Sequence, residues 1–199
     1  LVEADPIQYR MLAFGDSITS GVSTPYGGYT YYLERLLDTQ AGTTVVINAG
    51  KGGERTGEGL ARIESTLTKW NDIQFVLLME GSNDVTDSSG AGPLESIITN
   101  LRGMIQIVRD DYAKEVILGT IPPRVSCEGD QASPTTLELV QAIRDLAAEE
   151  AVPLADHYQY FTDTADWEAL FHDTLHPNDQ GYEVLANSWL EGALEDLLP

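Results

Sequence analysis

The sequence predicts a three-layer α/β/α sandwich built on one parallel five-stranded sheet. Short apolar runs without polar alternation recur along the chain, as expected of strands that are buried on both faces. Segments with apolar residues at helical spacing lie between these runs. This alternation of strand and helix gives a parallel sheet covered by helices on both faces. The chain has 199 residues and no internal repeat or linker, so we expect a single domain over residues 1–199.

Five apolar runs are the expected strands, and they cover residues 11–14, 45–47, 75–79, 116–118 and 153–155. Helical spacing of apolar residues is found over residues 60–70, 94–108 and 140–147. A last helix is expected from residue 179 to about 198, with Leu185, Trp189, Ala193 and Leu197 on its apolar face. Ligands of such sheets bind beyond the carboxyl ends of the strands, so the loops that follow the strands are expected to carry the chemistry.

The charge balance excludes several classes of function. Against 32 acidic residues stand only 11 basic ones, giving a formal net charge of -21. Such a surface repels phosphate backbones and anionic membranes, so we expect no nucleic-acid partner. No run of 18 apolar residues is present, so we expect no membrane span. The chain begins with Leu1, which is compatible with a removed export signal; a secreted or periplasmic location is one expectation, and the compartment stays open.

Cysteine and histidine patterns give no indication of a metal site. The single cysteine, Cys127, rules out an internal disulfide and a multi-cysteine metal site. Neither H-E-x-x-H nor C-x-x-C is present, and the phosphate-binding pattern G-x-x-x-x-G-K-[ST] is also missing. We therefore expect no metal and no cofactor.

A serine follows the first strand in the segment Gly15-Asp16-Ser17. At the end of a strand its hydroxyl can point toward a ligand, but serine is a weak nucleophile that needs a base beside it. A turn or helix-capping serine is the alternative. The elbow G-x-S-x-G of α/β-hydrolases is absent, because Thr19 occupies the place of its second glycine.

The loops after the second and third strands carry glycines and an asparagine. Gly50, Gly52 and Gly53 follow the second strand, where glycine lets the backbone approach a ligand and present an N–H group. Asn83 follows the third strand, and its side-chain amide can donate to a developing oxyanion. The alternatives are a flexible turn for the glycines and an Asx turn or helix cap for Asn83.

An acid–histidine pair lies near the C-terminus. Asp173 precedes His176 by three residues, so its carboxylate can accept one ring N–H and leave the other ring nitrogen to act as a base. His172 and His157 are the competing candidates for this base.

Together, and in this order, the four clusters resemble the GDSL, or SGNH, hydrolase superfamily over almost the whole chain. The resemblance implies that Ser17 is the nucleophile, with Asp173 and His176 completing a catalytic triad. It also implies an oxyanion hole formed by the N–H groups of Ser17 and Gly53 and the amide of Asn83. Gly50 and Gly52 compete with Gly53 for this role; Gly53 is preferred because an acid, Glu54, follows it. Ile18 replaces the leucine of the usual motif.

The expected function is therefore a serine esterase that hydrolyses short-chain or acetyl carboxylic esters through an acyl-enzyme intermediate, with a small-molecule ester as partner. Residues 24–29, 84–92 and 122–133 are the candidate specificity loops. Trp167 and Phe171 are expected to line an acyl or sugar pocket, with packing on a helix face as the alternative. The oligomeric state stays open.

Two other classes of protein have comparable features. A flavodoxin-like electron carrier would share the small size, the acidity and the flavodoxin-like parallel five-stranded sheet, but it has no use for Asp173 and His176. A non-catalytic sugar- or lipid-binding module on the same fold would not need all four clusters intact.

Overall fold

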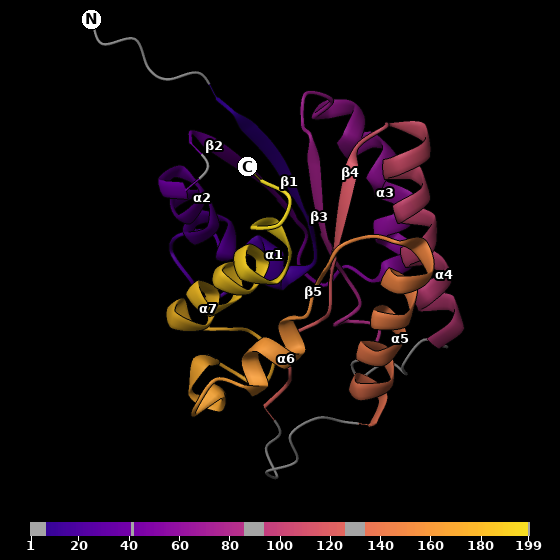
Figure 1. Cartoon of the computed structure of the whole chain (residues 1–199). Coiled ribbons are helices and arrows are strands. Elements are labelled where there is room, and N and C mark those ends of the chain that lie inside the picture. The colour runs from indigo at the N-terminus through magenta and orange to yellow at the C-terminus, as the bar shows by residue number, and fades with distance from the viewer. Residues whose placement is uncertain (1–6, 41, 86–93, 126–133, 199) are drawn as a thin grey trace, which may run out of the picture.

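The computed structural model describes residues 7–40, 42–85, 94–125 and 134–198. A central sheet of parallel strands runs through the molecule, with helices on both sides (Figure 1). The strands are β1 (Tyr9–Gly15), β2 (Thr44–Gly50), β3 (Phe75–Met79), β4 (Glu115–Gly119) and β5 (Leu154–Ala155). Their order in the sheet is β2-β1-β3-β4-β5. This is the strand order of the flavodoxin-like doubly wound fold. The predicted three-layer α/β/α fold is confirmed.

The helices form one layer on each face of the sheet (Figure 1). One layer contains α3 (Thr56–Lys69), α4 (Leu94–Gln106) with the π-helical turn η2 (Ile107–Asp111), and α5 (Pro134–Glu150). The other contains α1 (Ser17–Ser20), α2 (Tyr29–Gln40), α6 (His157–Thr162), the 3-10 helix η3 (Trp167–Leu170), α7 (Asp179–Trp189) and the π-helical turn η4 (Leu190–Leu194). None of the helices in the described part of the chain is long and apolar enough to cross a membrane.

Successive residues of each strand enter opposite cores, which explains why the apolar runs do not alternate. Leu12 and Phe14 of β1 pack into the core under α3, α4 and α5. Met11 and Ala13 pack into the core under α2 and α7. Both faces of the strand are therefore removed from water, as the sequence predicts for a central parallel strand.

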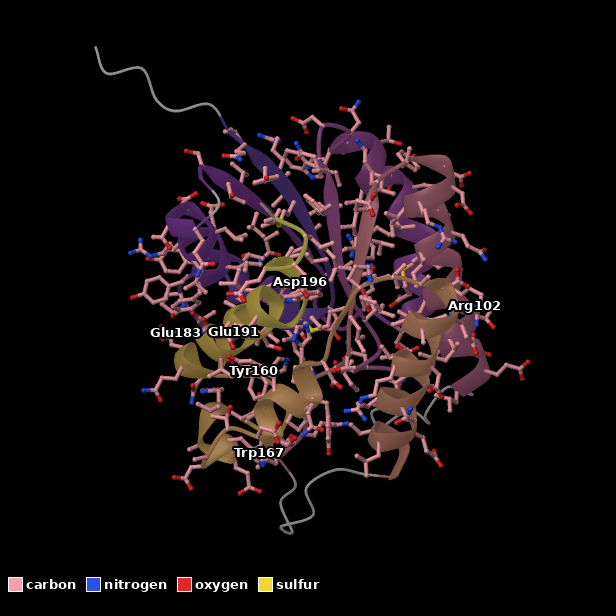
Figure 2. All side chains as sticks on the ribbon, viewed as in Figure 1. Arg102, Tyr160, Trp167, Glu183, Glu191 and Asp196 are labelled. Carbon is pink, nitrogen blue, oxygen red and sulfur yellow. The ribbon has the colours of Figure 1, made fainter. Side chains whose placement is uncertain are left out.

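The outer surface of the α3–α5 layer carries ion pairs that join neighbouring helices. Arg102 of α4 lies at the outer edge of this layer (Figure 2). Its guanidinium binds Glu149 of α5 at 2.6 Å and also contacts Glu150. Pairs exposed to this degree add little stability, so the apolar cores carry most of the packing energy.

Two features of the helices differ from the expectation. Helix α2 was not among the predicted helices, although Tyr29, Leu33 and Leu37 are spaced by four and fully buried. The polar and glycine-rich residues before Tyr29 are typical of a loop and obscure the start of this helix. The last helix was predicted to keep Leu197 on its apolar face, which is wrong. Regular α-helix ends at Trp189, the π-helical turn follows, and Leu197 is 39% exposed.

The carboxyl ends of three strands meet at the centre of the sheet. Gly15 at the end of β1 pairs with Gly50 of β2 on one side and with Met79 of β3 on the other. The chain leaves β1 for the sheet edge and returns to the opposite side of β1, so this is the point where the strand order reverses. Ligands of doubly wound sheets bind at this point.

A buried histidine makes the stability of the fold sensitive to acid. His157 is fully buried against Trp189, with ring centroids 4.4 Å apart, and its Nδ1 lies 2.8 Å from Ser188 Oγ. Burial lowers the pKa of His157 to about 3, outweighing the opposite effect of Asp156. In the unfolded chain the His157 side chain binds a proton near pH 6.5. The contribution of neutral, buried His157 to the free energy of unfolding is therefore present above that pH and is lost as pH falls toward 3.

We expect the free energy of unfolding to fall by about 2 kcal/mol between pH 7 and pH 5 because of this group alone. Urea unfolding of the wild type and of His157→Gln at both pH values measures it. The variant starts less stable at pH 7 but loses less on acidification. An equal loss in both proteins would contradict the assignment to His157.

Candidate active site

The serine that follows β1 is fixed by a short capping network. Ser17 is the first residue of α1, and Asp16 caps this helix by accepting the Ile18 N–H at 2.9 Å. Asp16 is buried, and burial raises its pKa to about 6, although hydrogen bonds from Ile18 and Ser82 and the nearby His176 act in the opposite direction. The local sequence thus holds the Ser17 hydroxyl at the carboxyl end of β1.

Ser17, His176 and Asp173 form a continuous hydrogen-bonded chain, although Ser17 lies 159 residues before His176. The distance from Ser17 Oγ to His176 Nε2 is 2.9 Å. The distance from His176 Nδ1 to Asp173 Oδ2 is 2.8 Å. This geometry allows the imidazole to take a proton from the serine while the carboxylate orients the ring.

The carboxylate of Asp173 is held in its ionised form. Partial burial acts to raise its pKa, but hydrogen bonds from the backbone and ring of His176 and from the Leu175 backbone outweigh this effect. The pKa of Asp173 is therefore lowered to about 2. Its Oδ1 accepts both backbone N–H groups at 2.7 Å, so the same side chain also shapes the loop before His176.

Backbone hydrogen bonds close the loop that carries Asp173 and His176. The His172 N–H donates to the His176 carbonyl at 2.8 Å, and Phe171 pairs with Pro177 in an antiparallel bridge. Asn178 N–H donates to the Leu170 carbonyl at 2.8 Å, while the Asn178 side chain caps α7. Asp173 and His176 are therefore held between η3 and α7.

The structure distinguishes Gly50 from the other two glycines that the sequence leaves in competition. The N–H of Gly50 donates to Asn48 Oδ1 at 2.9 Å, so it is already engaged. A Cβ at Gly50 would lie 2.1 Å from the Ser20 nitrogen, which explains the glycine by close backbone approach. Gly53 has a φ of 74°, a left-handed conformation that favours glycine, and a Cβ there would meet nothing within 4 Å. A Cβ at Gly52 would also meet nothing within 4 Å, so this clearance does not distinguish Gly52 from Gly53.

Asn83 joins the loops after β1, β2 and β3. Its Nδ2 donates to the Glu54 carbonyl at 2.8 Å and lies 3.4 Å from Asp16 Oδ2. The first contact places the amide next to the Gly53 loop, and the second places it beside the residue that precedes Ser17. The long distance to Asp16 leaves that N–H free to turn toward a stronger acceptor.

Asp84 ties the loop after β3 to the start of α3. Its two carboxylate oxygens accept the N–H of Thr56 at 3.0 Å and the hydroxyl of Thr56 at 2.8 Å. The Asp84 side chain is buried, so these two bonds fix the loop after β3 against the first residue of α3.

The two aromatic residues expected in the substrate pocket pack against each other. Trp167 is only 7% exposed, and its ring meets the ring of Phe171 edge-on with centroids 5.8 Å apart. Phe171 also packs against Phe161 at 5.5 Å. These contacts pack both rings beside the loop that carries His176. A substrate contact of Trp167 or of half-buried Phe171 stays a prediction.

The remaining predicted groups lie apart from this chain of hydrogen bonds or outside the described residues. His172 is exposed, and His157 is paired with Ser188 rather than with Ser17. In the specificity loop 24–29, Tyr26 is 52% exposed and stacks on Tyr31 at 5.0 Å. Of the other two candidate loops, residues 86–92 and 126–133 lie outside the described residues.

Several residues around the site were not identified from the sequence. Asn48 donates to the carbonyls of Thr19 at 2.7 Å and of Gly27 at 2.8 Å, and so links α1 to the following loop. Glu80 is buried directly after β3, in the loop that carries Asn83. A polar residue inside or directly after an apolar strand is the signal that could have indicated Asn48 and Glu80.

Comparison with known proteins identifies the family. Residues 13–184 match the sequence model of the GDSL-like Lipase/Acylhydrolase family. The chain belongs to this family. A triad and an oxyanion hole are typical of the GDSL-like family, and the chain is accordingly a carboxylic ester hydrolase. This membership also excludes the electron carrier that composition alone left open.

Individual relatives of the GDSL-like chain are distant in sequence but similar in fold. An arylesterase from Vibrio mimicus is 24% identical over 188 residues, covering 94% of this chain and 88% of the relative. The crystal structure of a lipase/acylhydrolase from Enterococcus faecalis is 25% identical, with a TM-score of 0.79 over 92% of this chain and 94% of that one. The structure of an acetylxylan esterase from Geobacillus stearothermophilus is 24% identical, with a TM-score of 0.77 over 94% of each chain.

Proposed function

We propose that this GDSL-like hydrolase cleaves short-chain or acetyl esters with Ser17 as nucleophile, His176 as general base and Asp173 as the residue that orients the imidazole. The observation that supports this assignment most is the unbroken series of contacts, 2.9 Å from Ser17 Oγ to His176 Nε2 and 2.8 Å from His176 Nδ1 to Asp173. A nucleophile hydrogen-bonded to a base, which a third group orients, is the arrangement that acyl transfer requires.

In the proposed mechanism, Ser17 Oγ attacks the ester carbonyl carbon and its proton passes to His176 Nε2. The tetrahedral intermediate collapses as His176 returns this proton to the departing alcohol, which leaves Ser17 acylated. Water then attacks the acyl group, His176 accepts a proton from the water, and the proton returns to Ser17 as the acid departs. Asp173 remains ionised throughout and stabilises the imidazolium.

Negative charge develops on the carbonyl oxygen in both steps. We assign its stabilisation to the N–H groups of Ser17 and Gly53 and to the side-chain amide of Asn83. Gly53 is favoured over Gly50 by the engagement of the Gly50 N–H with Asn48, and over Gly52 by its position next to Glu54, whose carbonyl binds Asn83. Such donors stabilise the transition state more than the ground state.

A small acyl group is favoured by the relatives of this chain. The relatives named arylesterase and acetylxylan esterase suggest a small acyl group on an aromatic or sugar alcohol. The acidic surface disfavours polyanionic substrates.

Two measurements test the proposal. We expect kcat/KM to fall along the series p-nitrophenyl acetate, butyrate and octanoate. We also expect a serine-directed fluorophosphonate to label Ser17, as located by mass spectrometry of the digested protein, and to leave Ser17→Ala unlabelled. Ser65→Ala, which removes an exposed hydroxyl on α3, is the matched control. Hydrolysis of none of these esters, or an adduct on another residue, would contradict the proposal.

A further inference from the structure

A buried carboxyl group without a hydrogen-bond donor lies behind the loops that carry Gly53 and Asn83. Glu80 directly follows β3 and is 1% exposed. Among the described residues, no N–H or O–H group donates to either oxygen of its carboxyl. The carboxyl lies against α3, where a Cβ at Gly59 would be 3.3 Å from Glu80 Oε1, so the glycine leaves room for it. An ionised carboxylate in this position would be strongly destabilised, whereas a protonated one can donate a hydrogen bond.

The carboxylate of Glu54 lies against the same part of α3, because it binds Arg62, which follows Gly59 by three residues. Glu54 is also buried, but it has its own cations. Arg62 binds it through Nε at 2.9 and 3.0 Å and through Nη2, and Lys51 Nζ binds it at 3.2 Å. Burial acts to raise the pKa of Glu54, and the two cations outweigh it, so this pKa is lowered. One carboxylate is thus held ionised beside one that has no donor, an arrangement in which the pair shares a single proton.

We propose that Glu80 is a positioning residue whose protonated carboxyl donates a hydrogen bond to the Glu54 carboxylate and thereby joins the two loops that carry Gly53 and Asn83. Glu54 follows Gly53 directly, and its carbonyl accepts the Asn83 amide at 2.8 Å. Glu80 precedes Asn83 by three residues in the other loop. The Glu80–Glu54 bond therefore adds a second link, behind the Asn83–Glu54 bond. The catalytic consequence rests on the proposed function, because it concerns the oxyanion donors.

The charges that face Glu80 make this link sensitive to alkali. Burial is the largest cause that raises the pKa of Glu80 well above its ordinary value, followed by the negative charges of Asp16 and Glu54. Arg62 acts in the opposite direction. When high pH removes the shared proton, two buried carboxylates repel each other and the bond between the loops is lost. We therefore expect the oxyanion donors to lose their alignment at alkaline pH.

Infrared spectroscopy tests the protonation state without using activity. At pH 8 we expect the wild type to show the carbonyl band of a protonated carboxylic acid, because Asp16, with a pKa of about 6, is then ionised. Glu80→Gln should lose this band. Glu115→Gln, which removes an exposed carboxylate at the amino end of β4, should keep it. The absence of the band from the wild type, or its persistence in Glu80→Gln, would overturn the proposal.

Kinetics with p-nitrophenyl acetate between pH 7 and pH 10 test the positioning role. Glu80→Gln keeps a donor that cannot ionise, so we expect kcat near the wild-type value at pH 7 and no alkaline loss of kcat. Glu80→Leu lacks the donor, and we expect about a 10- to 100-fold lower kcat at pH 7 with KM little changed. Unchanged kcat in Glu80→Leu, or the same alkaline loss in Glu80→Gln as in the wild type, would overturn the proposal.

The two assays distinguish this proposal from the proposed function. Full activity in Ser17→Ala would refute the assignment of Ser17 as the nucleophile. The infrared band of Glu80 does not depend on activity and can be measured in Ser17→Ala itself. If Glu80→Leu does not fold, the alkaline profile and the spectrum of Glu80→Gln still decide the outcome.

Discussion

Ser17→Ala and His176→Ala should each lower kcat by a factor on the order of 10⁴–10⁶, and the double variant should be hardly slower than either single variant. The reason is that the two side chains act as one unit: the hydroxyl is a poor nucleophile without the base 2.9 Å away, and the base has no proton to accept without the hydroxyl. Steady-state hydrolysis of p-nitrophenyl acetate by the four proteins provides the comparison.

A neighbouring histidine provides the control for this cycle. His172→Ala removes an exposed imidazole from the same loop and leaves the backbone bond from His172 N–H to the His176 carbonyl in place. We expect its kcat to stay close to that of the wild type. If the losses in Ser17→Ala and His176→Ala were instead additive in free energy, the two residues would act in separate steps and the shared role would be wrong.

The positions of the reacting groups follow largely from the sequence because parallel strands bring their carboxyl ends together. Ser17, Gly53 and Asn83 each follow a different strand, and the register that pairs Gly15 with Gly50 and Met79 brings their loops to one place. His176 is less constrained by the sheet, but Asp173 three residues earlier can bind its ring only within one short loop. The spacing of three residues was therefore enough to predict that Asp173 binds the His176 ring.

The sequence could not distinguish residues whose role depends on a partner from a distant segment. Gly50, Gly52 and Gly53 at the end of β2 and in the following loop look alike in the sequence. Only the structure shows that the N–H of Gly50 donates to the Asn48 side chain. Asn48 itself binds the carbonyls of Thr19 and Gly27, which lie 29 and 21 residues away. Trp167 shows the same limit, because an aromatic residue near a catalytic loop suits a pocket and a packed cluster equally well before its neighbours are known.

Charged residues beneath the site were missed for a related reason. An acid after a strand, such as Glu80, is compatible with exposure to water, and only the packing of α3 over it creates the buried environment. The Arg62 side chain that compensates Glu54 comes from the next helix, eight residues later. Neither spacing nor composition indicates that these groups meet.

The second large effect is expected at the oxyanion hole. Asn83→Ala should lower kcat by about 10²–10³-fold and leave KM nearly unchanged, because the lost amide donates mainly to charge that develops in the transition state. The same change removes the 2.8 Å bond to the Glu54 carbonyl, which could also loosen the Gly53 loop. Thermal unfolding measured beside the kinetics separates these effects, since a loosened loop lowers Tm and a lost oxyanion donor does not.

Two further variants make the assignment of Asn83 specific. Asn83→Asp preserves the size of the side chain but replaces the donating amide by a carboxylate, which repels the developing oxyanion; its kcat should be at least as low as that of Asn83→Ala. Asn187→Ala removes a half-buried amide of α7 whose side-chain bond in the described structure, 3.0 Å to the Glu183 carbonyl, lies within its own helix, and should leave kcat unchanged. A raised KM at constant kcat in Asn83→Ala would instead make Asn83 a residue that binds the substrate in its ground state.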